Sequence, residues 1–276
     1  MAVFLALVSA TVYGAADFYG GIASRRTPPA TVVVLSQLAG IIVLAIAWFL
    51  LPGKFYPADI GWGIAAGFAG SIAIAALYAA LAVGRMGVVS PITAVIGASV
   101  PVLAGVLFGE RPAPLAIVGL ACAFVAVALV SANAETSRIS LSEPGVAPAL
   151  ISGVAIGALF VLLGHGHTDA GLARLAITRT TSIALLCAYA LLRRESLRPA
   201  VGSMRIILVA GALDMLANVL FIAATRYGLL AIVSVLTSLY PASTVFLARV
   251  VLKEHLTPIQ WIGVGLAAFG VAFVAI

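Results

Sequence analysis

The sequence predicts an all-α membrane protein: ten transmembrane helices, arranged as two inverted five-helix repeats around a central cavity. Three observations predict this fold: an apolar composition, ten apolar runs of membrane-spanning length, and a similarity between the two halves of the chain. Of 276 residues, 63% are hydrophobic and only 9% are charged, and the mean hydropathy is +1.23. These residues cannot supply the polar surface of a soluble protein, so we expect lipid to cover most of the molecule.

Apolar runs broken by charges, Pro or Gly define the elements in order. A helix needs about 20 residues to cross the hydrocarbon of a bilayer, whereas the strands of a membrane barrel would be short and alternating. The first run lacks the basic stretch of a cleavable signal, so we interpret it as the first helix. Helices are expected at residues 2–22, 30–51, 58–83, 86–108, 112–131, 146–165, 170–192, 203–226, 228–252 and 257–276.

The longest polar stretch, Ser131 to Gly145, lies near the middle of the chain. We expect a linker at residues 136–145, between a first repeat of residues 1–135 and a second repeat of residues 146–276. The repeats share ordered residues: Arg85, Gly87, Pro101, Glu110 and Gly119 correspond to Arg226, Gly228, Pro241, Glu254 and Gly263. Because each repeat has an odd number of spans, the second enters the membrane from the opposite side. Such inverted repeats are typical of alternating-access transporters.

The basic residues predict the orientation. The odd-numbered loops hold ten of them: Arg25, Arg26, Arg85, Arg138, Arg193, Arg194, Arg198, Arg205, Arg249 and Lys253. The even-numbered loops hold only Lys54, Arg111, Arg174 and Arg226. Since basic loops are normally cytoplasmic, we expect both termini on the non-cytoplasmic side of a bacterial inner (plasma) membrane. The net charge is +6, but its dispersal between apolar runs argues against a nucleic-acid partner.

One motif near the end of each repeat resembles a known family. The stretch PVLAGVLFGERPAPLAIVGLACAFVAVALV and the counterpart ending in VLKEHLTPIQWIGVGLAAFGVAFVAI resemble the EamA-type exporters of the drug/metabolite transporter superfamily. That family ends each repeat with a helix-terminal Glu, a short turn and a Gly-rich closing helix. The motif stands here as Glu110, Arg111 and Pro112, and as Glu254, His255 and Pro258; the sequence departs from the pattern in a second proline, Pro114. The resemblance implies export of small metabolites, among which amino acids are the best-known cargo.

Polar residues at helical spacing indicate which helix faces turn away from lipid. Tyr13 and Asp17 share a face of the first helix with Ser9, and Asp214 and Asn218 share a face of the eighth. An unpaired carboxylate in hydrocarbon costs several kcal/mol, so both acids are predicted to be functional. Asp214 lies farther from a helix end and is the candidate for proton coupling.

Each acid also has a structural alternative. Asp17 could reach the headgroups or pair with Arg25 or Arg26. Asp214 could pair with Arg179 or Arg205 and so hold two helices together.

Pro101 and Pro241 are the hinge candidates, because a proline inside a helix removes one backbone hydrogen bond and permits a kink. The polar residues beside them are predicted to line the cavity: Ser90, Thr93, Ser234, Ser238 and Tyr240. The alternative is that the Ser and Thr hydroxyls bond their own helix backbone. Tyr78 is a further cavity residue, with a role as an interfacial anchor as its alternative.

Catalytic and cofactor motifs are missing from the sequence. It has no Asp-rich motif, HExxH, GxSxG or Walker sequence. His165, His167 and Asp169 are the only cluster of metal-ligand types, and we interpret them as a solvated loop. We therefore expect a secondary transporter, not an enzyme, that works as a monomer in lipid on a small-molecule substrate, without metal or cofactor. The alternatives are a multidrug or other metabolite exporter of the same fold and an intramembrane enzyme.

Overall fold

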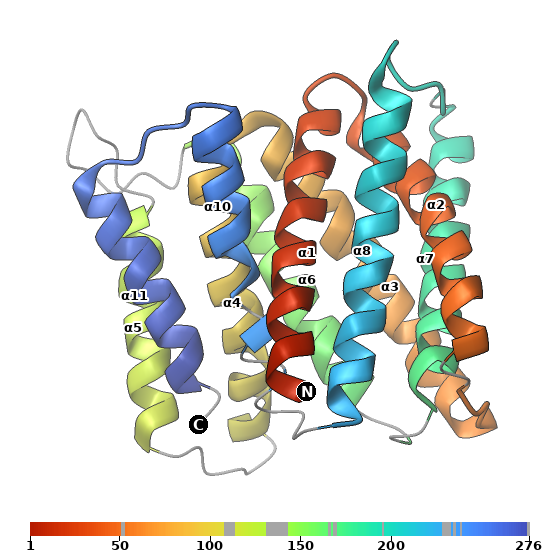
Figure 1. Cartoon of the computed structure of the whole chain (residues 1–276), viewed down its shortest axis with the longest axis horizontal. Coiled ribbons are helices and arrows are strands. Elements are labelled where there is room, and N and C mark those ends of the chain that lie inside the picture. The colour runs from red at the N-terminus through yellow and green to blue at the C-terminus, as the bar shows by residue number, and fades with distance from the viewer. Residues whose placement is uncertain are drawn as a thin grey trace.

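In the computed structural model, all regular structure within the described residues is α-helical. The structure describes residues 1–50, 53–107, 114–130, 143–164, 167, 170–194, 196–227, 233, 236–237 and 239–274. The helices are α1 (Ala2–Ser24), α2 (Pro29–Leu50), α3 (Pro57–Val83), α4 (Met86–Leu107), α5 (Pro114–Val130), α6 (Val146–Gly164), α7 (Gly171–Leu192), α8 (Ser203–Thr225), α10 (Tyr240–Val251) and α11 (Pro258–Val274). They form one layered bundle with both termini at the same end (Figure 1).

Six of these helices are long and apolar enough to cross a membrane: α1, α2, α3, α6, α7 and α8. Two shorter apolar stretches, Met86–Gly97 in α4 and Pro258–Gly270 in α11, lie beside them in the bundle. The prediction of an all-helical, multi-pass membrane protein is therefore confirmed. The count of ten spans stays a prediction.

Proline marks the start of several helices. Pro29, Pro57, Pro114 and Pro258 are the first residues of α2, α3, α5 and α11. This position suits proline because the first N–H groups of a helix have no intrahelical partner, so nothing is lost when one is missing.

A proline near a helix start also accounts for a difference from the predicted ninth helix. Residues 228–252 were expected to form one continuous helix with Pro241 as an internal hinge. Instead Leu239 lies in a turn, and Pro241 stands in the first turn of α10. A proline ring clashes with the carbonyl four residues earlier, so a turn interrupts the segment just before Pro241, after the helical residues 236–237. The role of Pro241 as a hinge stays a prediction. Pro101, by contrast, lies within the continuous helix α4.

The packing pairs helices from the two halves of the chain. α1 packs on α8 and α6 on α3; α2 also packs on α8, and α7 on α3. α4 packs on α6 and α10 on α1, while α5 and α11 pack on each other at one side of the bundle (Figure 1). The two halves pack in the same way. If α1 to α5 are exchanged with α6, α7, α8, α10 and α11 in that order, most of these helix pairs become another pair of the same set.

Glycines allow the closest helix contacts. A Cβ atom on Gly211 of α8 would overlap the Ser36 carbonyl oxygen of α2. Two Gly-xxx-Gly spacings also allow close packing, because Cβ atoms at these positions would overlap α7 or α4. These are Gly63 and Gly67 of α3, and Gly153 and Gly157 of α6.

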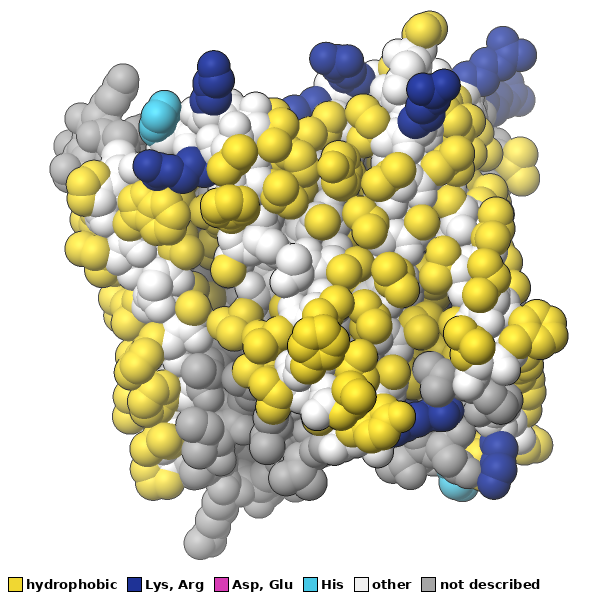
Figure 2. All heavy atoms as spheres, in the orientation of Figure 1, with side chains coloured by type: hydrophobic (Ala, Val, Ile, Leu, Met, Phe, Trp, Pro, Cys, Tyr) yellow, Lys and Arg dark blue, Asp and Glu magenta, His cyan; other side chains and the backbone are white. Residues whose placement is uncertain are grey.

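The outer surface matches a lipid environment. Large apolar side chains are exposed along the flanks of the helices, among them Ile42, Phe49, Phe68 and Ile262. On the face shown in Figure 2 they form a broad band, and the Lys and Arg side chains lie at its two ends. More of these basic side chains lie at the end opposite the termini, as the loop pattern predicts.

Candidate functional site

The site is built on the contact between α1 and α8, which run antiparallel (Figure 1). The Ser9 hydroxyl of α1 donates a hydrogen bond of 2.8 Å to the Ala217 carbonyl oxygen of α8. Side chains on one helix face recur every three or four residues, so Tyr13 and Asp17 lie on the same face as Ser9. The face of α1 that carries Ser9, Tyr13 and Asp17 is thus packed against α8.

Asp214 forms an ion pair in the middle of α8. Arg179 of α7 donates from Nη2 to Asp214 Oδ2 at 2.7 Å, and the two side chains are 13% and 19% exposed. The Asn218 amide donates to the Asp214 carbonyl oxygen at 2.8 Å, one turn along the same helix. Of the two predicted alternatives for Asp214, the structure therefore shows the pair with Arg179, which joins two helices.

Asp17 has a different environment. It is only 7% exposed, and among the described residues its carboxylate has no hydrogen bond or ion pair. The pairing with Arg25 predicted as an alternative does not occur, because Arg25 binds Glu254. Asp17 lies close enough to Asp214 for the two carboxylates to interact electrostatically. Two acids and one arginine thus share the interior of the bundle.

Three tyrosines surround these charges. The ring centroids of Tyr13 and Tyr240 lie 6.5 Å apart with the rings tilted, and the buried Tyr240 hydroxyl has no hydrogen-bond partner in the part of the chain that the structure describes. Tyr78 of α3 is 1% exposed and bonds Ser36, so the alternative of an interfacial anchor does not apply. We call the group the central polar cluster, and it consists of Tyr13, Asp17, Tyr78, Arg179, Asp214 and Tyr240.

The remaining predicted cavity residues beside the two prolines are not members of this cluster, and two of them lie outside the described residues. The buried Thr93 hydroxyl donates to the Val89 carbonyl oxygen at 2.9 Å, as the backbone-bonding alternative predicts. The Ser90 hydroxyl is buried and has no hydrogen-bond partner within the described residues. Ser234 and Ser238 lie outside the described residues, as do Glu110, Arg111 and Pro112 of the first motif.

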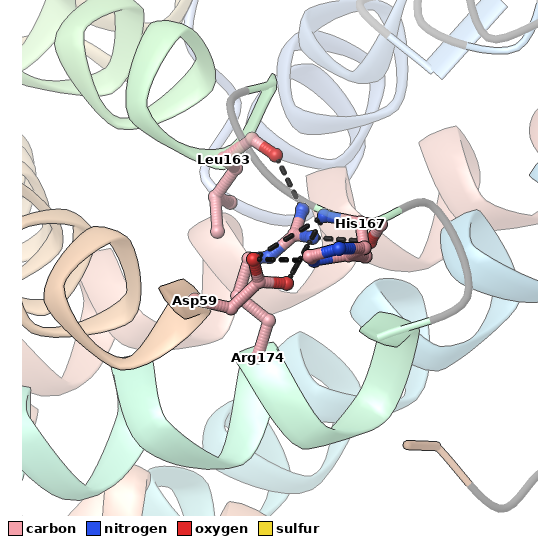
Figure 3. A network of polar contacts seen from close by, with 4 residues as sticks. All are labelled: Asp59, Leu163, His167 and Arg174. Atoms are coloured by element: carbon pink, nitrogen blue, oxygen red, sulfur yellow. Dashed lines mark hydrogen bonds and ion pairs between the residues drawn. The ribbon is translucent and has the colours of Figure 1, made fainter. Parts of the chain in front are cut away.

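A second polar network lies at the end of the bundle that carries the termini (Figure 3). Asp59, at the start of α3, is 2% exposed and accepts from Arg174 Nη2 at 2.9 Å. It is also 3.0 Å from His167 Nδ1 and accepts from the His167 backbone N–H. Arg174 donates in addition to the carbonyl oxygens of Leu163 and His167. The network fastens α3 to the segment between α6 and α7.

Of the three residues of the predicted solvated loop, the structure describes His167, which belongs to this network. The His167 ring stacks on Tyr56 with centroids 4.0 Å apart and binds Asp59. His165 and Asp169 lie outside the described residues, and the described part of the chain holds no group of three potential metal ligands.

A third polar contact lies at the opposite end. Arg25 donates to Glu254 Oε1 at 3.0 Å, and Glu254 Oε2 accepts from the Gly87 backbone N–H at 3.3 Å. Gly87 lies in the first turn of α4, where backbone N–H groups lack intrahelical partners and favour a negative charge. The motif glutamate of the second repeat therefore caps a helix of the first.

Sequence reasoning did not single out Asp59 or Arg174. Asp59 lies 108 positions from His167 and 115 positions from Arg174 in the chain. Only the packing of α3 against α7 brings them together. A signal was present: an acid in the first turn of one apolar run and an arginine in the first turns of another. Nothing local in the sequence shows that the two runs touch.

Comparison with known proteins gives three results. The model of the EamA-like transporter family matches residues 1–132 and again residues 143–276. No curated protein matches the chain. Solved structures do match, 18 chains in all. One of them, described only as the crystal structure of a protein, has a TM-score of 0.65 at 16% identity over 99% of this chain and 95% of that one, which shows a shared fold. With both halves matched by the same family, the chain belongs to the EamA-like transporters of the drug/metabolite superfamily.

Proposed function

We propose that the protein exports amino acids and related small metabolites across the bacterial inner membrane by alternating access. Ten spans would form two inverted repeats, residues 1–135 and 146–276, joined by the linker at residues 136–145, with both termini outside the cytoplasm. Membership of a transporter family supports a small-molecule substrate. The pairing of helices from the two halves supports a site at the interface of the repeats.

The central polar cluster is the observation that carries this proposal. Charged groups inside a membrane bundle are expensive, so a cluster of two acids and an arginine among apolar helices needs a function. Its residues come from α1, α3, α7, α8 and α10, and therefore from both proposed repeats. A substrate bound among them would contact both bodies that move in alternating access.

Counterflow in proteoliposomes tests the function. The purified protein is reconstituted with an unlabelled amino acid inside, and uptake of radiolabelled amino acids is followed across a panel, with nucleotides and cationic drugs as controls. We expect at least one amino acid to accumulate transiently above its equilibrium level. Hydrolysis or group transfer without flux of any compound would point to the alternative of an intramembrane enzyme.

A second candidate substrate class is the cationic drug. It is favoured by the excess of acids in the cluster, since its described residues include two carboxylates, Asp17 and Asp214, and one arginine, Arg179. Counterflow of cationic drugs without any flux of amino acids would favour it over amino-acid export.

A further inference from the structure

The central polar cluster contains one cationic and one anionic side chain, Arg179 and Asp17, whose hydrogen-bonding groups are not all used by the described residues. Arg179 donates one hydrogen bond, from Nη2 to Asp214, and binds no other carboxylate among the described residues. A guanidinium carries five N–H donors in a planar fork that suits a carboxylate. Because Asp214 and Arg179 are both partly exposed, at 19% and 13%, a second carboxylate can approach this guanidinium.

Asp17 is the anionic group of the cluster that suits a bound cation. Its carboxylate only accepts hydrogen bonds, is 7% exposed, and has no partner within the described residues. A buried polar group without a partner is destabilising, and such groups are rare in folded proteins unless a ligand completes them. The buried Tyr240 hydroxyl lies within electrostatic reach of Asp17 and is likewise without a partner. A cation bound here would satisfy the Asp17 carboxylate and give the tyrosine oxygen a donor.

The helix geometry gives the distance along the helix axis between Asp17 and Asp214, the partner of Arg179. Ser9 is level with Ala217 where α1 meets α8. The helices are antiparallel, so at a rise of 1.5 Å per residue Asp17 lies roughly 7 Å along the axis from the level of Asp214. An α-amino acid, with a hydrogen bond of about 2.8 Å at each charged end, spans a similar length. The axial offset between Asp17 and Asp214, whose carboxylate binds Arg179, is therefore comparable with the length of one small zwitterion.

We propose that Asp17 and Arg179 are the specificity-determining residues of the transport site, Asp17 binding the ammonium group and Arg179 the carboxylate of a zwitterionic α-amino acid. The substrate carboxylate takes the place of Asp214 at the guanidinium, so the ion pair of the empty protein is the resting form of the carboxylate site. This inference rests on the proposed function and adds the groups that the substrate must carry.

Three matched ligands test the inference on the wild-type protein. They are the amino acid that the protein carries fastest, its primary amide, which lacks the carboxylate, and its deaminated acid, which lacks the ammonium group. Each analogue competes for counterflow of the labelled amino acid. We expect each to bind at least about 10-fold more weakly than the amino acid, since each loses one charge-assisted interaction. Equal competition by all three would overturn the inference.

Two variants test the assignment of each charge. Arg179→Gln is expected to abolish the preference for the amino acid over its amide while keeping the preference over the deaminated acid. Asp17→Asn is expected to do the reverse. Arg179→Lys keeps the positive charge and should restore part of the carboxylate preference. Arg205→Gln, an exposed arginine in the first turn of α8, is the matched control and should leave both ratios unchanged.

These ratios separate specificity from stability. A purely structural role would weaken all three ligands by the same factor in each variant, and that result would contradict the inference. If Arg179→Gln does not fold, the Lys variant and the wild-type ratios decide the question. Counterflow of amino acids with unselective competition would reject this inference alone, whereas no counterflow of any amino acid would reject the proposed function as well.

Discussion

Asp214 and Arg179 meet near the middle of their helices, far from either end of the bundle. Each charge alone would be unstable among apolar helices, and their contact at 2.7 Å offsets that cost. Asp17, one helix away, has no such partner among the described residues. At the scale of single residues, the two acids that resemble each other in the sequence therefore have different environments: Asp214 forms an ion pair, and Asp17 has no such contact within the described residues.

The first prediction concerns the Arg179–Asp214 pair. Asp214→Asn leaves the arginine without its charge partner in a poorly solvated site, so the free energy of unfolding should fall by about 3 kcal/mol. The double variant with Arg179→Gln should recover part of this loss, because no unpaired charge remains. Thermal unfolding in detergent measures both. A stable Asp214→Asn protein that loses only its response to a pH gradient would instead identify Asp214 as the proton-coupling residue.

The second prediction concerns Gly211. A methyl group there would overlap the Ser36 carbonyl oxygen, so Gly211→Ala must push α8 away from α2. We expect a loss of about 2 kcal/mol in stability, together with slower transport, since α8 carries Asp214. Gly61→Ala is the control, because a Cβ atom there would meet nothing within 4 Å. Equal stability of the two variants in the same unfolding assay would show that the helices can separate without cost.

At the scale of the elements, the end of α10 depends on one unusual backbone position. Lys253 has φ of 56°, in the left-handed region that non-glycine residues rarely adopt. This conformation turns the chain so that the Glu254 N–H bonds the Ala248 carbonyl oxygen at 3.3 Å, while the Glu254 side chain reaches the start of α4. A glutamate at the end of one helix thereby stabilises the beginning of another.

The third prediction follows from this cap. Glu254→Ala removes the acceptor and the charge at the start of α4, so the amides of Gly87 to Val89 should exchange hydrogen faster, with a stability loss of about 1 kcal/mol. Arg25→Gln removes the ion pair and the Arg25 hydrogen bond to the Gly84 carbonyl oxygen but keeps Glu254 at the start of α4, so it is the matched control. Its effect should be smaller, because the Arg25 side chain is 34% exposed and water screens the pair. Unchanged exchange in the alanine variant would show that the contact does not stabilise α4.

The fourth prediction separates the two hinge prolines. Pro101 lies inside α4, so Pro101→Ala restores a backbone donor within a continuous helix and should slow transport by removing flexibility. Pro241 stands in the first turn of α10, where no helical hydrogen bond is lost, so Pro241→Ala should change transport less. Counterflow rates, corrected for the amount of inserted protein, give the comparison. Equal slowing by both variants would contradict this distinction.

At the scale of the whole molecule, polar contacts tie the two halves of the chain together at both ends of the bundle. Asp59 binds Arg174 and His167 at the end with the termini, and Glu254 binds Arg25 at the other. Alternating access requires the two ends to open in turn, so each contact would have to break in one half of the cycle. The central polar cluster lies between them, near the middle of the helices.

The fifth prediction concerns orientation. Both termini lie at the end of the bundle that shows fewer basic side chains in Figure 2, and basic loops are normally cytoplasmic. A reporter fused after Ile276 should therefore behave as non-cytoplasmic, and a reporter inserted between Ser131 and Gly145 as cytoplasmic. Reversed signals from the two positions would overturn the orientation and exchange the side from which substrate enters.

Much of the fold could be predicted from the sequence. Apolar runs of sufficient length determine where helices lie, because backbone groups in lipid must bond within their own segment. The predicted limits of α1, α3, α6 and α8 agree with the observed ones to within two residues. Within the described residues, the ninth segment departs from the expected continuous helix, because a turn at Leu239 interrupts it just before Pro241, and the local sequence does not show whether a proline bends a helix or interrupts it.

The partners of the buried charges were decided by the tertiary structure. From the sequence, Asp214 had two possible arginine partners and Asp17 had two others, and all four lie on apolar runs or beside them. Helix spacing tells which face of a helix a residue occupies, but not which helix that face meets. Because α8 packs beside α1 with α7 within reach, Asp214 pairs with Arg179, whereas Asp17 has no ion pair with any residue that the structure describes. Local hydrophobicity thus determines the elements, while long-range contacts between them determine the site.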